Sequence, residues 1–169
     1  MDPGVDELWQ GEPTAVVLEN ARRKAQAGLA DAPEGALALG CDTEVVLGGR
    51  VLGKPASRDD ARDYLQALSG RAHDVFSGLA LLGPALASGN DDGRDVPERS
   101  GVSRSRVRFR SLEGEAIDRY LDTGEWRDRA GGYALQGLGA ALVEAVEGDV
   151  ANVVGLPVSL LWELAPELF

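Results

Sequence analysis

Helical and strand periodicities alternate along this chain, and that alternation constrains its fold more than any other feature. Apolar residues at helical spacing predict a helix over residues 15–30, capped by Thr14. An alternating apolar run over 36–46 predicts a strand, and the Gly48-Gly49 turn followed by Val51-Leu52 continues it as a hairpin. Since helical and strand segments interleave, we predict the α/β class, with a mixed sheet and flanking helices.

The same patterns extend this interpretation to the end of the chain. Ser57 and Asp60 resemble a capping box and begin a helix that Ser69-Gly70 ends. The remaining predicted helices cover 115–122 and 160–164, and the remaining predicted strands cover 75–82, 102–109, 140–146 and 153–158. Residues 88–101 are polar, Gly-rich and aperiodic, so we expect a long flexible surface loop inside a single domain over 1–169.

Charge and composition exclude several classes of partner. The formal net charge of −11 repels polyanions, so we expect no nucleic-acid polymer as a partner. A small nucleotide remains compatible, because a few local cations and a divalent metal act within a Debye length of about 10 Å. We find no apolar window long enough to cross a membrane and no secretory signal, so we expect a cytoplasmic protein without a membrane partner. Cys41 is the only cysteine, so no internal disulfide can form.

Two short motifs carry candidate chemistry. Asp42 and Thr43 lie where one apolar run meets the next, and a carboxylate there is costly to bury unless it is paired or binds a metal. A strand-end aspartate that accepts backbone hydrogen bonds is the competing interpretation. Lys54 follows Gly53 and precedes Pro55, which favours an extended backbone and suits contact with a phosphate. An exposed turn lysine explains that motif equally simply.

A third motif is rich in glycine. Over residues 126–139, four glycines are interleaved with Tyr133 and Gln136. The pattern indicates either a flexible connector or a rigid loop whose backbone N–H groups face a ligand. The Gln136 amide offers both a donor and an acceptor, which suits the edge of a base. We expect Asp42, Lys54 and Gln136 to converge on one hollow. His73, the only histidine, is expected at the surface or a strand edge without a role.

Taken together and in this order, these segments resemble the Maf family of nucleotide pyrophosphatases. The residues that carry the resemblance are Val5-Asp6-Glu7, Lys24-Ala25, Asp42-Thr43, Gly53-Lys54-Pro55, Leu68-Ser69-Gly70, the Ala-Gly-Gly-Tyr-Ala-Leu-Gln-Gly run at 130–137, and the Asn-Val-Val-Gly-Leu-Pro run at 152–157. The resemblance implies a two-lobed fold of the inosine-triphosphate-pyrophosphatase type, with the site in the cleft between the lobes. It also suggests a homodimer.

The resemblance implies hydrolysis of a nucleoside triphosphate to the monophosphate and pyrophosphate, assisted by a divalent cation such as Mg²⁺ or Mn²⁺. The catalytic base of the family falls on Asp42, and its substrate-selecting positions fall on Thr43 and Gln136. Thr and Gln at these positions favour dTTP and UTP. As a mechanism, we expect Asp42 to accept a proton from the attacking water and Glu7 to share the metal with Asp42.

The phosphates are expected to meet three cations, which are Lys24, Lys54 and Arg129. The alternative for Lys24 is a solvated helix face beside Arg22 and Arg23. Arg129 stands where the family usually has lysine, and a guanidinium can bind phosphate with two hydrogen bonds.

One departure from the family leaves other functions open. The family normally begins with a strand and a Ser-x-x-Arg-Arg loop that grips the triphosphate, and no residues before Val5 match them. The alternatives are therefore a catalytically impaired nucleotide-binding regulator of cell division or septum formation, a 7-methyl-GTP pyrophosphatase, and a chain with an unsatisfied sheet edge that is unstable alone.

Overall fold

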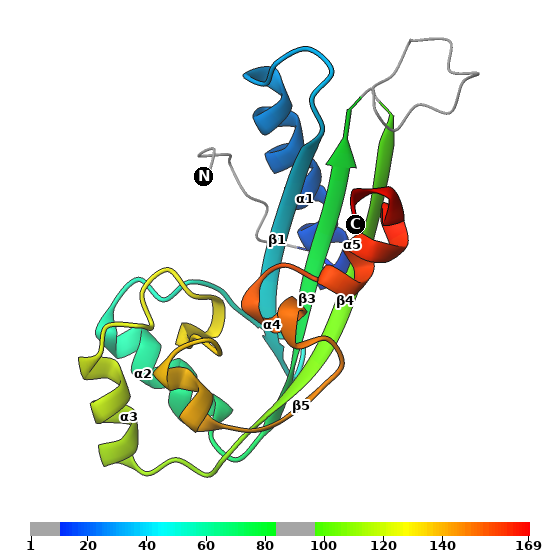
Figure 1. Cartoon of the computed structure of the whole chain (residues 1–169). Helices are drawn as coiled ribbons and strands as arrows, with labels where there is room; N and C mark the ends of the chain where they lie inside the picture. Colours follow the sequence, from blue (N-terminus) through cyan, green and yellow to red (C-terminus); the bar gives the residue numbers. More distant parts are fainter. Residues whose placement is uncertain (1–10, 84–96) are drawn as a thin grey trace.

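A five-stranded sheet with helices on both faces organises the computed structural model, which describes residues 11–83 and 97–169 (Figure 1). The strands lie in the order β2-β1-β3-β4-β5. Their bounds are Ala38–Leu47 for β1, Arg50–Leu52 for β2, Ala72–Leu82 for β3, Glu98–Phe109 for β4 and Val143–Glu147 for β5. The fold therefore belongs to the predicted α/β class.

Every described strand pairing is antiparallel, although we expected a mixed sheet. Both β2 and β3 pair antiparallel with β1, so these two strands run in the same direction on either side of it. The helix α2, Arg58–Leu68, connects them in the manner of a parallel crossover. Interleaved helices and strands suggest parallel neighbours, but here β1 lies between the two parallel strands.

The helix α1, Pro13–Ala30, lies directly on one face of the sheet. This close approach depends on glycine, because a Cβ atom at Gly40 would lie 2.0 Å from the Ala21 carbonyl oxygen and one at Gly78 would lie 2.2 Å from that of Val17. The helix packs there through small side chains, including Ala21 and Ala25. Its first residue follows Glu12, which takes the N-cap position that we predicted for Thr14.

Short helices cover the opposite face of the sheet. Successive strand side chains point to opposite faces, and Cys41, the neighbour of Gly40, donates its S–H to the Gly155 carbonyl oxygen at 3.0 Å. Gly155 ends α4, Val150–Val154, which is followed by α5, Val158–Leu164. The predicted strand over 153–158 is therefore wrong. The Asp149 side chain caps α4 by accepting from the Ala151 N–H at 2.8 Å.

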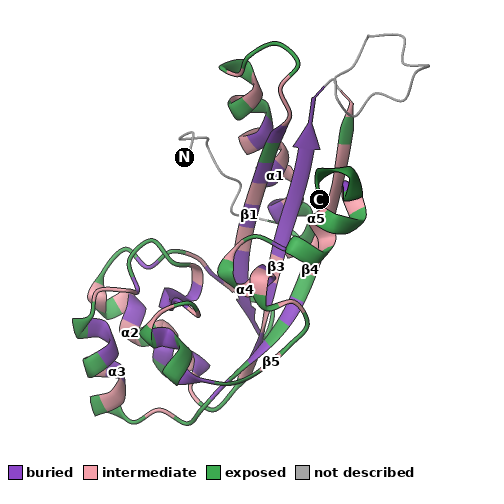
Figure 2. Cartoon of the chain, in the orientation of Figure 1, coloured by how far each residue is buried: buried purple, intermediate pink, exposed green. Residues whose placement is uncertain are grey.

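A second lobe forms around α2 and α3, Gly114–Asp122, at the far end of the sheet (Figure 1). Its core is built from large side chains such as Leu65, Phe109 and Trp126. Figure 2 shows these helices buried on their inner sides, and β3 buried along most of its length. The expected two-lobed arrangement is thus present, with one lobe around α1 and one around α2 and α3.

Several predicted boundaries change in the structure. The first strand residue of β4 is Glu98, so residues 98–101 of the predicted flexible loop form a strand, and residues 88–96 lie outside the described part of the chain. The predicted strand over 140–146 becomes a 3₁₀ turn, Leu138–Leu142, followed by β5. The predicted Ser57 cap is confirmed, because its hydroxyl accepts from the Asp60 N–H at 3.1 Å. None of the described helices is long and apolar enough to cross a membrane.

Candidate active site

One pocket collects residues from both lobes. Six of the seven residues predicted for the site line it: Lys24, Asp42, Thr43, Lys54, Arg129 and Gln136. The seventh, Glu7, lies outside the described residues. The predicted convergence of Asp42, Lys54 and Gln136 on one hollow is therefore confirmed, while the role of each side chain remains a proposal.

Asp42 is the buried carboxylate of this pocket, with 8% of its surface exposed. Two side chains of α1 hold its two oxygens: Asn20 Nδ2 donates to Oδ2 at 3.0 Å and Lys24 Nζ donates to Oδ1 at 2.6 Å. Residues four apart lie on the same face of a helix, so one face of α1 supplies both donors. Sequence reasoning missed Asn20, although its spacing from Lys24 was the available signal.

Thr43 points to the other face of β1, as strand alternation requires. Its hydroxyl lies 2.7 Å from the hydroxyl of Ser77, the residue paired with it on β3. Ser77 in turn donates to the Asn152 carbonyl oxygen at 3.2 Å. These contacts connect the pocket to the first turn of α4.

Asn152 fixes α4 to the sheet. It is fully buried, and its Nδ2 donates to the Val75 carbonyl at 3.1 Å and to the Ser105 hydroxyl at 3.0 Å. The residues that follow it, Val153, Val154 and Gly155, line the pocket. The Asn-Val-Val-Gly-Leu-Pro motif therefore shapes the pocket through docking of a helix rather than as the buried strand we expected.

Cys41 lines the pocket beside Asp42 but is a poor nucleophile. Burial, reinforced by the negative charge of Asp42, raises the pKa of its thiol to about 12. The thiolate is the reactive form of cysteine, so Cys41 remains a protonated thiol near neutral pH. This agrees with its predicted role as a small packing residue.

The opposite wall of the pocket is residues 124–139, which we call the site loop. Its two ends are joined by Glu125, whose carboxylate accepts from the Leu138 N–H at 3.1 Å and the Gly139 N–H at 3.3 Å. Its middle is joined to the first strand hairpin, because the Gly131 N–H donates to the Gly53 carbonyl at 3.1 Å, next to Lys54. The loop is therefore anchored at several points, as the rigid-loop interpretation requires.

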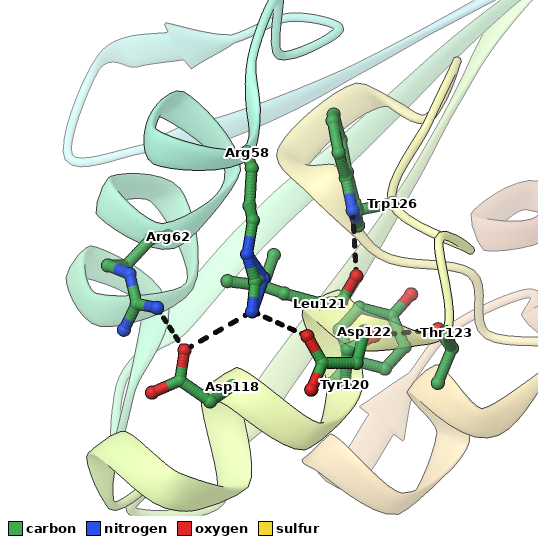
Figure 3. A network of polar contacts seen from close by, with 8 residues as sticks. All are labelled: Arg58, Arg62, Asp118, Tyr120, Leu121, Asp122, Thr123 and Trp126. Carbon is green, nitrogen blue, oxygen red and sulfur yellow. Dashed lines mark hydrogen bonds and ion pairs between the residues drawn. The ribbon is translucent and has the colours of Figure 1, made fainter.

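The end of α3 supports the site loop. Trp126 Nε1 donates to the Leu121 carbonyl at 3.1 Å, and the Ala134 N–H donates to the Tyr120 hydroxyl at 3.0 Å. Figure 3 shows Trp126 directed at Leu121 beside the Thr123 turn that ends this helix. Trp126 is thus a packing and anchoring residue.

Ion pairs hold α3 against α2 on the outer side of the same lobe (Figure 3). Arg58 donates to Asp122 at 2.6 Å and lies 3.4 Å from Asp118, which also pairs with Arg62. The side chains of Asp118 and Asp122 are largely exposed, so these pairs contribute modestly to stability.

His73 is buried in the lobe core and not at the surface, so that prediction is wrong. Only 2% of it is exposed, and its Nε2 lies 2.9 Å from the hydroxyl of Tyr133. Its ring also meets Phe109 and Tyr133 edge to face. Burial lowers the pKa of His73 to about 4, so the imidazole is neutral at pH 7. Because Tyr133 lines the pocket, His73 supports the site loop from behind.

The oxygen ligands of the pocket suit a hard cation only in part. Asp42 and Asp128 both line it, and Mg²⁺ is usually held by one or two carboxylates together with substrate phosphates. Within residues 11–83 and 97–169, no group of three or more His, Cys, Asp or Glu side chains forms a closed metal site. The donors therefore fit a metal that arrives with a polyphosphate.

The fold and the pocket define an α/β protein with a cleft that combines a buried carboxylate, three cations and a base-sized amide donor–acceptor. The chain belongs to the family of Maf-like proteins, whose model matches residues 1–168.

Similar proteins are named dTTP/UTP pyrophosphatase. One from Dictyoglomus thermophilum is 41% identical over 99% of this chain and 83% of its own length. One from Alkalilimnicola ehrlichii is 45% identical over 93% of this chain and 75% of its own length. A third, from Pyrococcus furiosus, is 38% identical over 94% and 77%, respectively.

Proposed function

We propose that this protein hydrolyses nucleoside triphosphates, with dTTP and UTP as its preferred substrates, to the nucleoside monophosphate and pyrophosphate. The observation that carries the proposal is the single pocket in which Asp42 faces Lys54, Arg129 and Gln136. The names of the similar proteins support the same reaction.

In the proposed reaction, a water oxygen bonds to the α-phosphorus while the bond from that phosphorus to the bridging oxygen of the β-phosphate breaks. Asp42 accepts the proton that the water loses. The carboxylate is held in place by Asn20 and Lys24, and a fixed, water-shielded base needs little reorganisation during the reaction.

The cations stabilise the charge that moves onto the pyrophosphate. Lys54 and Arg129 lie on opposite sides of the Gly53–Gly131 backbone hydrogen bond and both line the pocket. Lys24 is the third cation, and in the structure it pairs with Asp42. Phosphoryl transfer depends mainly on positioning and on charge stabilisation of this kind. Gln136 and Thr43 are proposed to contact the base.

We further propose a divalent cation, Mg²⁺ or Mn²⁺, held by Asp42 together with the phosphates of the substrate. When bound, it would supply positive charge to the triphosphate and lower the pKa of a bound water. Glu7 remains the proposed second protein ligand.

The proposal is tested with the purified chain and a panel of dTTP, UTP, CTP, ATP, GTP and 7-methyl-GTP, with Mg²⁺ or Mn²⁺. Products are identified by chromatography, and pyrophosphate and orthophosphate are measured separately. We expect pyrophosphate and monophosphate in a one-to-one ratio, fastest from dTTP and UTP. Release of orthophosphate and a diphosphate would contradict the reaction, and a preference for 7-methyl-GTP would contradict the substrate. Nucleotide binding without turnover would favour the regulatory alternative.

A further inference from the structure

Ser77 is a buried hydroxyl behind the pocket that neither the sequence motifs nor the proposed mechanism uses. It is fully buried on β3, between Thr43 of the pocket wall and Asn152 of α4. Any role of Ser77 in recognising a base rests on the proposed function, because it acts through the same pocket.

The direction of the hydrogen bonds in this chain of contacts is determined by its far end. A carbonyl oxygen can only accept, so the Ser77 hydroxyl donates its one proton to the Asn152 carbonyl at 3.2 Å. Ser77 has no second proton for Thr43, although their hydroxyl oxygens lie 2.7 Å apart. Thr43 must therefore donate to Ser77.

This direction decides what Thr43 can offer to a ligand. Its only proton points inward to Ser77, and only lone pairs of its oxygen remain for the pocket that it lines. Thr43 is thus an acceptor and requires a donor on the substrate. Gln136 cannot supply this discrimination by itself, because a side-chain amide can turn either its oxygen or its nitrogen to a base.

We propose that Ser77 is a specificity-positioning residue that makes the Thr43 hydroxyl an obligatory acceptor for the N3–H of uracil or thymine. Cytosine has an unprotonated N3, so its lone pair would face the lone pairs of Thr43. A site built to pair with a substrate N–H discriminates strongly against an analogue that lacks it. The arrangement therefore favours UTP over CTP and dTTP over dCTP.

The test compares kcat/KM for UTP and CTP in the full chain and in Ser77→Ala. Removal of the Ser77 hydroxyl frees Thr43 to rotate and donate, so we expect the UTP:CTP ratio to fall about tenfold, mainly through better use of CTP. Ser77→Thr keeps a hydroxyl and is expected to keep the ratio of the unaltered protein. The Asn152 carbonyl also accepts from the Gly155 N–H at 3.1 Å, so Ser77→Ala does not leave it unsatisfied.

Ser105→Ala is the matched control. Ser105 is another buried sheet serine, 1% exposed, which contacts Asn152 Nδ2 and donates to the Asp149 carbonyl. It also anchors α4 but does not contact Thr43, so its removal is expected to lower stability and leave the UTP:CTP ratio unchanged. Thr43→Val gives a second, independent variant, in which loss of the acceptor lowers kcat/KM for UTP more than for CTP.

The outcomes separate this inference from the function on which it rests. An unaltered chain that releases no pyrophosphate from UTP defeats the proposed function. An active chain whose UTP:CTP ratio stays the same in Ser77→Ala, or falls equally in Ser105→Ala, overturns the role of Ser77 and leaves the proposed function standing.

Discussion

The two walls of the pocket are built in different ways. One wall, which we call the strand wall, consists of Lys24, Asp42 and Thr43 on α1 and β1, where backbone ladders and close helix packing determine positions. The other wall is the site loop, 124–139, where single side chains such as Glu125 and Tyr120 hold backbone N–H groups. The strand wall is therefore sensitive to added volume, and the site loop to the loss of individual side chains.

This difference suggests a division of labour. The strand wall holds the proposed base, which needs a fixed position, on regular structure. The site loop carries Arg129 and Gln136, both exposed, and these contact the substrate in the proposed mechanism. Defects in the strand wall should lower kcat or the stability of the protein, whereas defects in the site loop should raise KM.

The largest effect is expected at the centre of the strand wall. Asp42→Asn preserves the shape of the side chain but removes the proton acceptor, so we expect kcat for dTTP to fall about 10³-fold. Thermal melting should show a folded protein. Asp74→Asn is the control, because Asp74 lies on β3 outside the pocket and pairs with Arg104. Equal turnover by Asp42→Asn and the unaltered protein would remove Asp42 from the mechanism.

Added volume under α1 should destabilise the strand wall most. In Gly78→Ala the new Cβ meets the Val17 carbonyl oxygen at 2.2 Å, so we expect a loss of about 3 kcal/mol in the free energy of unfolding. Gly28 lies in the same helix as Val17 with no atom near its potential Cβ. Gly28→Ala should therefore gain about 0.5–1 kcal/mol from helix propensity. Urea denaturation of both variants checks the contrast, which fails if the two respond alike.

Acid should weaken the side of the pocket that His73 supports. The pKa of His73 is lowered from 6.5 to about 4 in the folded protein, so the unfolded chain binds a proton at higher pH than the folded one. Stability is then lost as the pH falls through 6.5 toward 4, and its contribution between pH 7 and pH 5 is about 2 kcal/mol. His73→Gln cannot titrate, so urea midpoints measured at both pH values should fall less for this variant. A parallel fall in both proteins would contradict the assignment.

Loss of one anchor should loosen the site loop without unfolding the protein. Glu125→Ala removes the acceptor for the Leu138 and Gly139 N–H groups. We expect KM for dTTP to rise about tenfold, or about 1.4 kcal/mol, while kcat changes little. Glu115→Ala serves as a control, since Glu115 lies on α3 and makes only a 3.7 Å exposed pair with Arg119. A fall in kcat at constant KM would place Glu125 on the catalytic side of the pocket instead.

The smallest effect is expected at the ion pairs between α2 and α3, far from either wall. Arg62→Ala removes a pair with Asp118, whose side chain is 45% exposed. The free energy of unfolding should fall by less than about 1 kcal/mol, and less still at high salt. Steady-state kinetics with dTTP should not change, and a raised KM would show that these pairs act on the site loop.

The sequence alone predicted much of the fold and most of the pocket. Local periodicity indicated α1, β1, the hairpin and α2, because each of these elements buries one face and shows it in its pattern. The ordered motifs brought Asp42, Lys54 and Gln136 to one site, as the structure confirms. Periodicity failed at 153–158, where a short apolar run fits a buried strand or a helix equally well, and the Asp149 cap and docking of Asn152 selected the helix.

Only the tertiary structure revealed the partners of the buried polar groups. Asn20 contacts Asp42 from 22 positions away, Tyr133 meets His73 across 60, and Asn152 meets Ser77 across 75. A residue pattern reports which side of its own helix or strand is buried, but it carries no record of the distant group that satisfies a buried donor or acceptor. The sequence therefore determined which elements form and which motifs line the pocket, and chain packing decided how each functional side chain is held.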